Sequence, residues 1–440
     1  MRRKKGILQR ERIKFKGGHV MENNKGKIFK KGSKQSGITL VALVVTVVVL
    51  LILAGVSIRL VLDNNGIITK AGEAKDKHEQ GRVNDQTDLS SAEEWINQMT
   101  GGNSGGGSLP TNADGSSKPY LPSSDFTQVS GTDLSNGLVI EDGSGNQYVW
   151  IEVPKTAAVY PTAGTAITEF TDDEYTAIET DLHTYTNDYR DGTSYKDEYY
   201  SEATTGLTSE AYSALKKKML KSVYQNGGFW IGRYEIGIDE NTTRSFGSDY
   251  STEHPTTDQT PVIKANKVPY NWIRCSQAES LAETFAPSGY TSSLMFGVQW
   301  NLVLKYLETK GASQADLKTD STSWGNYYNA TDFTITNTNA KYSTDKGASW
   351  ISVSTEGYSK PSSAVLLTTG ADVRNSEMNI YDLAGNVYEW TLEYTSLSSH
   401  PCAIRGGSYI DYGSDSPASY REISSTTHSN LDIGARVSLY

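Results

Sequence analysis

Cysteine and histidine are the residues of this chain that could carry redox or metal chemistry, and they are few and widely spaced. The 440 residues include two cysteines, Cys275 and Cys402, and six histidines. A soft-metal or redox centre needs thiolate or imidazole ligands at short spacing, and neither residue type recurs in that way. The GxSxG, HExxH and GxxxxGK(S/T) motifs are also missing. The spacing leaves open whether the two cysteines form a disulfide bond or stay free and buried.

Charge divides the chain into a basic start and an acidic remainder. Residues 1–37 carry thirteen Lys or Arg residues against two Glu, a net charge of +11, whereas the other 403 residues carry −21. A basic arm of this kind could bind nucleic acid. An apolar run follows it at once, which favours a membrane and no nucleic-acid partner, with the basic segment in the cytoplasm.

The apolar run, 38–58, is twenty-one residues long and has no charged side chain. At ~1.5 Å per residue a helix of this length spans a bilayer core of ~30 Å. A cleaved secretory signal is the alternative, but its apolar region is usually shorter and ends in a small-residue cleavage site. We therefore expect a single span in a bacterial cell membrane, with the rest of the chain outside the cytoplasm.

Composition divides the remainder into three parts. Residues 59–100 have intermittent apolar positions that suit a helical stalk. Residues 101–119 are rich in Gly, Ser and Asn, and we expect a flexible linker. Residues 120–440 change to short alternating strands, turns and scattered tryptophans, which indicates a folded domain.

Periodicity predicts several elements of this domain. The helix expected at 209–225 places Tyr212, Leu215, Met219 and Val223 on one face, which we assign to core packing rather than to a partner groove. Residues 311–365 are rich in Thr, Ser, Asn and Gly and are expected to form surface loops. The other expected elements are strands at 138–141, 147–153, 227–238, 402–408 and 433–440 and helices at 268–286 and 297–311.

The N-terminal segment resembles a known type of signal. KQSGITLVALVVTVVVLLILAGVSI followed by NNGIITKAGEAK is similar to the prepilin-type N-terminus of clostridial surface proteins. The resemblance implies that a prepilin peptidase cuts after Gly37 and leaves Ile38 as the new N-terminus. Type IV pilins carry glutamate at the fifth mature position, where this chain has Ala42, so filament assembly does not follow. Met21 is an alternative start that gives a leader of ordinary prepilin length.

A second resemblance covers residues 120–440. GNQYVWIEVP, GFWIGRYEI, LAGNVYEWT, RGGSY and GARVSLY follow one another as in the formylglycine-generating-enzyme type of C-type lectin fold. The implied fold class is α+β, C-type lectin-like, with short antiparallel sheets. Gly385 can turn the chain tightly, and Trp390 is expected in the core. No cofactor is required, but calcium is a candidate, because Asn386 and Glu389 are oxygen donors near the family's metal sites.

The resemblance does not extend to the family's chemistry. Oxidase members of the family hold copper with a pair of cysteines close together and downstream of the RGGS motif. This chain has no cysteine after Ser408. We therefore predict a domain without enzymatic activity.

Residues 408–432 lie between two expected strands, so their side chains could vary on a fixed backbone path. The segment resembles the variable region of proteins diversified by retroelements, in which asparagine codons become NNC codons. Glu422 is not reachable from such codons. Tyrosine and serine also dominate antibody paratopes, although an ordinary loop of this composition is the alternative. The reachable residues, taken as ligand-binding, are Tyr409, Ile410, Asp411, Tyr412, Asp415, Ser416, Tyr420, Ile423, Ser424, Ser425, His428, Asn430, Leu431 and Asp432.

These features together predict a cell-surface protein that binds a protein or glycan on another cell, a host or a phage, in adhesion or recognition. Two alternatives remain, namely an envelope enzyme of the formylglycine-generating type and a minor pilin that decorates a filament.

Overall fold

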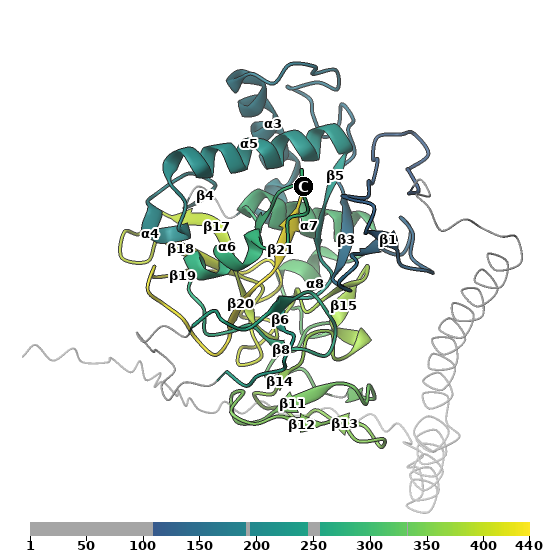
Figure 1. Ribbon diagram of the computed structural model, residues 1–440, viewed down its shortest axis with the longest axis vertical. Coiled ribbons are helices and arrows are strands. Elements are labelled where there is room, and N and C mark those ends of the chain that lie inside the picture. Colours follow the sequence, from purple (N-terminus) through teal and green to yellow (C-terminus); the bar gives the residue numbers. More distant parts are fainter. Residues whose placement is uncertain (1–108, 191–193, 245–255, 332) are drawn as a thin grey trace, which may run out of the picture. The chain divides into compact units, whose positions relative to one another are not determined.

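The computed structural model describes residues 109–190, 194–244, 256–331 and 333–440, which all belong to one compact unit, Asp85–Tyr440 (Figure 1). The expected leader at 1–37, span at 38–58 and stalk at 59–100 lie outside the described residues. Within the described ranges, no helix is both long and apolar enough to cross a membrane.

A six-stranded antiparallel sheet contains the first and last strands of the domain. Its order is β1 (Thr127–Gln128), β2 (Val139–Glu141), β3 (Gln147–Glu152), β5 (Gly228–Gly232), β21 (Val437–Leu439) and β9 (Ser292–Leu294). Trp150 of β3 lies opposite Trp230 of β5, and both indoles are fully buried. The end of the chain thus lies inside the sheet, between β5 and β9.

A second sheet supports the C-terminal segment. Its order is β19 (Arg421–Ser424), β18 (Cys402–Arg405), β17 (Tyr388–Thr395) and β20 (Ile433–Ala435), and β4 (Tyr195–Lys196) also pairs with β17. Strands β17 and β20 are parallel, and the other pairs are antiparallel. Trp390 of β17 is buried, and its indole N–H donates to the Ile273 carbonyl at 2.9 Å. The prediction of Trp390 as a core residue is confirmed.

Helices join and cover the sheets. Helix α7 (Gly297–Thr309) is buried over most of its length and contacts both β3 and β17, so it lies between the two sheets. Helix α5 (Ser209–Asn226) packs on β5 and on α3 (Asp172–Tyr185). The expected apolar face of α5 is buried as predicted. The shorter helices are α4 (Glu202–Thr205), α6 (Cys275–Glu283), α8 (Gln314–Lys318), η1 (Asn187–Tyr189) and η2 (Val373–Asn375).

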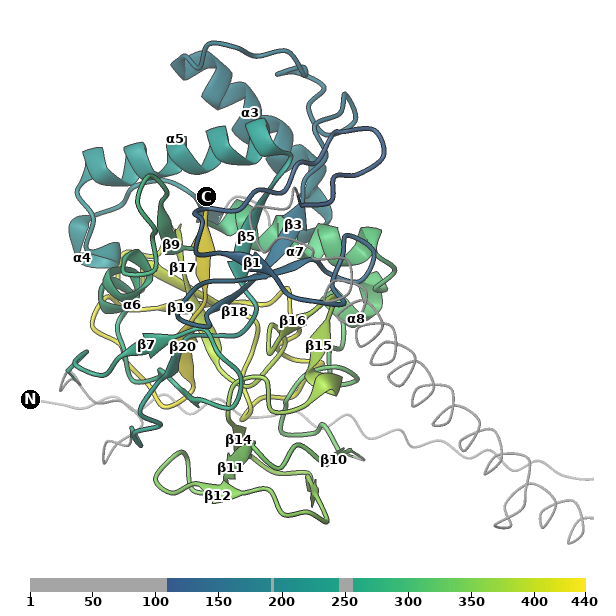
Figure 2. The ribbon, with the colours of Figure 1, turned by 45° about the vertical axis from the view of Figure 1, so that its right-hand side comes forward.

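Four small sheets complete the described part of the domain. In both views α3 and α5 lie at one end of it, and β11 and β12 lie at the opposite end (Figures 1 and 2). The small sheets are β7 (Pro261–Val262), β6 (Gly237–Ile238) and β8 (Val268–Pro269); β12 (Ile351–Ser352), β11 (Lys341–Ser343) and β14 (Leu366–Leu367); β10 (Thr334–Ile335) with β13 (Tyr358–Ser359); and β15 (Ser376–Glu377) with β16 (Ile380–Tyr381).

Several predicted elements differ from the structure. The helix expected at 268–286 is only α6, because Val268–Pro269 pairs with β6 and Trp272 adopts a left-handed φ of 56°. The strand expected at 227–238 is divided into β5 and β6. The expected linker at 101–119 is wrong for its described part, since Leu109 is buried and Ser117 accepts the Trp150 indole N–H at 2.9 Å.

Candidate ligand-binding face

The C-terminal segment, 408–432, follows a backbone path that neighbouring loops hold in place. The Tyr409 amide donates to the Asn386 carbonyl at 2.9 Å, next to the tight turn at Gly385, whose φ is 74°. The Tyr328 amide donates to the Asp411 carbonyl at 2.8 Å, and the Ala418 amide donates to the Ser321 hydroxyl at 2.9 Å. The segment therefore runs as a fixed path across the loop that contains Ser321 and Tyr328.

Eight of the fourteen predicted ligand-binding side chains are at least partly accessible. Ile410 is 39% exposed, Tyr412 is 48% exposed, and Asp415 is also exposed. The partly buried members are Asp411, Tyr420, Ile423, Ser425 and His428.

The other six predicted side chains point inward, which corrects their assignment as contact residues. They are Tyr409, Ser416, Ser424, Asn430, Leu431 and Asp432, and all are buried. Tyr409 and Leu431 belong to a small apolar cluster with Trp272, Leu366 and Val387. Ser424 lies in β19, where it pairs with Cys402 of β18. The expectation of one continuous outward-facing segment is thus wrong for these positions.

Tyr328 is a further partly accessible side chain, and no sequence pattern indicated it. Its ring centroid lies 5.5 Å from that of Tyr412, and Asp415 belongs to the same turn as Tyr412, since the Asp415 amide donates to the Tyr412 carbonyl at 3.0 Å. We name Tyr328, Ile410, Tyr412 and Asp415 the C-terminal face. It combines two aromatic rings, one aliphatic side chain and one carboxylate on a fixed backbone.

A polar groove of about 360 Å³ adjoins this face. One wall comes from Asp188, Tyr189 and Arg190 with Lys318 at the end of α8, and the other comes from residues between Ser414 and Arg421. Asp415 belongs to both the groove and the C-terminal face. The groove is thus partly formed by the same C-terminal segment.

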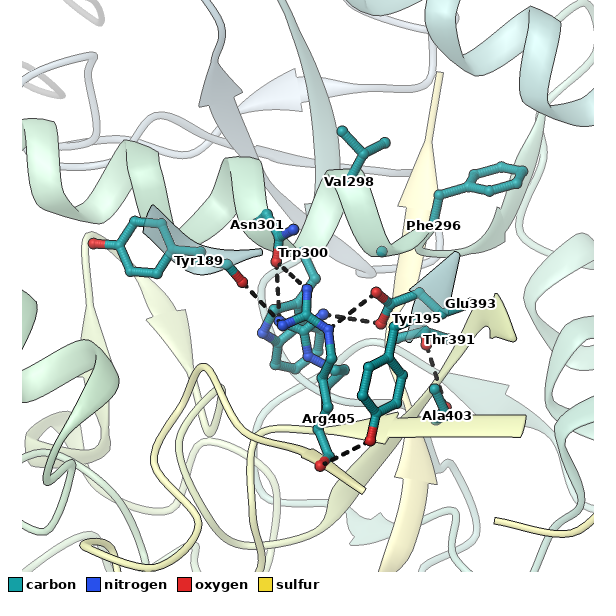
Figure 3. Close-up of polar contacts among 12 residues, drawn as sticks. Tyr189, Tyr195, Phe296, Val298, Trp300, Asn301, Thr391, Glu393, Ala403 and Arg405 are labelled. Atoms are coloured by element: carbon teal, nitrogen blue, oxygen red, sulfur yellow. Dashed lines mark hydrogen bonds and ion pairs between the residues drawn. The ribbon is translucent and has the colours of Figure 1, made fainter. Parts of the chain in front are cut away.

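A buried ion network fixes the strands beneath the groove (Figure 3). Glu393 of β17 accepts from Arg405 of β18 at 2.9 Å and from Arg421 of β19 at 3.1 Å. Both guanidinium groups also donate to the Asn301 side-chain oxygen of α7, at 3.1 and 2.9 Å. Burial raises the pKa of Glu393, but the charges of Arg421 and Arg405 outweigh burial and hold this pKa below its usual range. The carboxylate is therefore ionised, and the network ties three adjacent strands to one helix.

The side chains considered as calcium ligands already have protein partners. The Asn386 side-chain oxygen accepts from Asn326 at 2.9 Å and from the Leu367 amide at 3.1 Å. Glu389 forms an ion pair with Arg436 at 2.6 Å, and both groups are buried. Among the residues that the structure describes, no group of three or more His, Cys, Asp or Glu side chains could hold a metal ion. Calcium binding stays a prediction, and at Glu389 it would have to displace Arg436.

Both cysteines are free thiols, and both are buried. Cys275 lies at the start of α6 with its sulfur 3.6 Å from the Thr391 carbonyl, and Cys402 lies in β18 with its sulfur 3.7 Å from the Thr204 carbonyl. A hydrogen bond with Cys402, together with burial, raises the pKa of the Cys275 thiol well above its ordinary value. A protonated, buried thiol is a poor nucleophile and a poor metal ligand.

Comparison with known proteins finds a family model that matches the C-terminal part of the domain. Residues 221–439 match the family model of the sulfatase-modifying factor enzyme 1-like domain. The crystal structure of CarF is 13% identical, with a TM-score of 0.20, and the match covers 66% of this chain and 85% of that chain. Treponema denticola variable protein 1 is 13% identical, with a TM-score of 0.19, and the match covers 66% of this chain and 84% of that chain. No curated protein matches.

Proposed function

We propose that this chain, which contains a sulfatase-modifying factor enzyme 1-like domain at residues 221–439, is a ligand-binding protein without catalytic activity. The observation that carries the proposal is the C-terminal face, where accessible aromatic and aliphatic side chains stand on a backbone held by hydrogen bonds to neighbouring loops. Such an arrangement separates recognition from stability, because the accessible side chains are not those that hold the fold together.

The side chains of this face have the chemistry of a recognition surface. Tyrosine offers a large, rigid, amphipathic ring at low cost in conformational entropy. Tyr412 and Ile410 are among the few large apolar side chains of the described residues that are more than a third exposed. Tyr328 supports Tyr412 from the side, so the ring has a preferred position before a ligand arrives.

The placement of the cysteines supports the absence of oxidase chemistry. Copper-dependent oxidation needs two accessible thiolates that act together. Cys275 and Cys402 are the two cysteines of the chain, and both are buried. We therefore assign these thiols to the core.

Display at the cell surface and diversification of the C-terminal segment belong to the same proposal. Support for them comes from the sequence, namely the apolar run at 38–58, the prepilin-like cleavage site after Gly37 and the tyrosine- and serine-rich segment at 408–432. A reverse-transcriptase gene beside this gene, with a DNA repeat that differs from the segment mainly at adenines, would support diversification. Its absence from the neighbourhood would count against it.

A binding experiment with a matched control tests the proposed function. The full-length chain in mild detergent is applied to glycan arrays and to arrays of cell-surface proteins, together with its Tyr412→Ala and Tyr200→Ala variants. Tyr200 is also exposed and stacks on another tyrosine, Tyr394, at 5.4 Å, so the control removes an equivalent ring elsewhere. We expect Tyr412→Ala alone to lose binding. Equal binding by the two variants would place the binding surface elsewhere.

A second assay tests the absence of catalysis. The full-length chain is incubated with copper and a cysteine-containing peptide, and oxidation of the peptide thiol is followed by mass spectrometry. We expect no turnover. Turnover that disappears in Cys275→Ser or in Cys402→Ser would show an oxidase and overturn the proposal.

A further inference from the structure

The polar groove beside the C-terminal face holds two cationic side chains that have no carboxylate partner among the described residues. Arg190 directly follows η1, and Lys318 is the last residue of α8. Across the described ranges neither side chain lies within 4.0 Å of a carboxylate. The Lys318 ammonium lies 5.8 Å from the ring centroid of Tyr189, which helps to hold it at the groove wall.

Two other charged residues of the groove lining, Asp188 and Arg421, have ion-pair partners. Asp188 lies 3.7 Å from the Lys305 ammonium, which also pairs with Glu308 at 3.1 Å, and Arg421 is paired with Glu393. Asp415 is the other carboxylate of the groove lining, and Arg190 and Lys318 are its two remaining cations. The lining thus contains three cationic side chains and two carboxylates, a formal excess of one positive charge in a chain with a net charge of −10.

The rest of the lining is polar and suits a hydroxylated ligand. Ser414, Asp415 and Ser419 present hydroxyl and carboxylate oxygens, which can accept hydrogen bonds from alcohol groups. Tyr420 contributes a partly buried ring, and its hydroxyl donates to Glu422 at 2.7 Å, so the ring is held in position. An amphipathic ring beside polar oxygens matches a sugar, which has both C–H and O–H faces.

We propose that the groove binds an acidic saccharide, with the sugar carboxylate between Arg190 and Lys318 and the sugar hydroxyls toward Ser414 and Asp415. The inference rests on the proposed ligand-binding function and names its ligand class. The groove volume of about 360 Å³ is within the range of pockets for small ligands, which is ~300–1,000 Å³. A peptide partner is less well matched, because the centres of protein–protein contacts are usually depleted in charge and rich in apolar side chains.

Calorimetric titration of the full-length chain in mild detergent tests this inference. The probes are sialyllactose and a glucuronate-terminated disaccharide, with lactose as the neutral counterpart and an acidic hexapeptide as the peptide counterpart. We expect at least one acidic saccharide to bind and lactose to bind at least about 10-fold more weakly, since a hydrogen bond to a charged group is worth about 1.5–3 kcal/mol.

Charge-matched variants locate the binding. Arg190→Gln and Lys318→Gln should each weaken binding of the acidic saccharide at least about 10-fold. Lys218→Gln is the control, because it removes the same charge from a second cavity, of about 420 Å³, between α5 and the chain terminus. Equal binding of lactose, stronger binding of the hexapeptide, or a loss confined to Lys218→Gln would overturn the inference.

The titrations and the arrays together distinguish a failure of the acidic-saccharide inference from a failure of the proposed ligand-binding function. If neither acidic saccharide binds while a neutral glycan or a protein on the arrays does, the acidic-saccharide inference fails and the ligand-binding function stands. If nothing on the arrays binds either, both fail.

Discussion

Replacement of Glu393 by glutamine should destabilise the domain more than most substitutions on its surface. The carboxylate is buried between Arg405 and Arg421, at 2.9 and 3.1 Å, and Asn301 is the other acceptor that these guanidinium groups share. Glu393→Gln leaves two buried positive charges facing a neutral amide. Removing one partner of a buried ion pair costs about 3–5 kcal/mol, out of a total of about 5–15 kcal/mol for a typical domain.

Urea unfolding followed by tryptophan fluorescence measures this loss. With a slope of about 3 kcal/mol per molar urea, the unfolding midpoint should fall by about 1–1.7 M. Glu422→Gln is the matched control, because Glu422 is a partly buried carboxylate in β19 that bonds to the Tyr420 hydroxyl. We expect it to cost less than about 1 kcal/mol. If Glu393→Gln also lowers the free energy of unfolding by less than about 1 kcal/mol, the ion network does not stabilise the strands beneath the groove.

The pH dependence of unfolding gives a second signature of Glu393. Its pKa in the folded protein is held below the unfolded value, so its contribution to stability is present above the unfolded pKa and is lost as pH falls through the folded pKa. The Glu393→Gln variant should lack this part of the acid-induced loss of stability.

Three further predictions concern other parts of the domain. Burial raises the pKa of Glu279 to about 8, so its stabilising contribution is full below the unfolded pKa of about 4.5 and is lost as pH rises toward 8. At about 1.4 kcal/mol per pKa unit, Glu279→Gln should remove up to about 5 kcal/mol of pH dependence in urea unfolding between these values. Cys275 and Cys402 should resist an aromatic disulfide reagent in the native state and react after unfolding. Tyr412→Ala should change the free energy of unfolding by no more than about 0.5 kcal/mol.

Each of these has a clear contrary result. If the free energy of unfolding changes with pH in the same way in wild type and Glu279→Gln, the Glu279 carboxyl is not buried as described. Rapid modification of a native thiol would show access to the core. A large loss of stability in Tyr412→Ala would mean that this ring belongs to the core rather than to the C-terminal face.

The sequence predicts the parts of the fold that depend on local pattern. The apolar face of α5 follows from helical periodicity, and Thr208 and Gly227 delimit that helix as a capping hydroxyl and a left-handed terminus. Strands β2 and β3 follow from alternation on either side of a turn. The motif around Trp390 correctly places that side chain in the core.

The arrangement beneath the groove depends on contacts between distant segments, which local pattern does not specify. Glu393, Arg405, Arg421 and Asn301 come from three strands and a helix, and no spacing in the sequence relates them. The pairing of β19 with β18 likewise decides which side chains of 408–432 face inward. Tyr328 lies in a segment expected to be only a surface loop, so its contact with Tyr412 could not be anticipated.

Saturating substitution of 408–432, scored separately for folding and for binding to a target found on the arrays, tests the central claim most directly. We predict that substitutions at Ile410, Tyr412 and Asp415 leave folding intact and abolish or alter binding, whereas those at Tyr409, Ser424 and Leu431 impair folding. Binding that tolerates every substitution at the three exposed positions would contradict it.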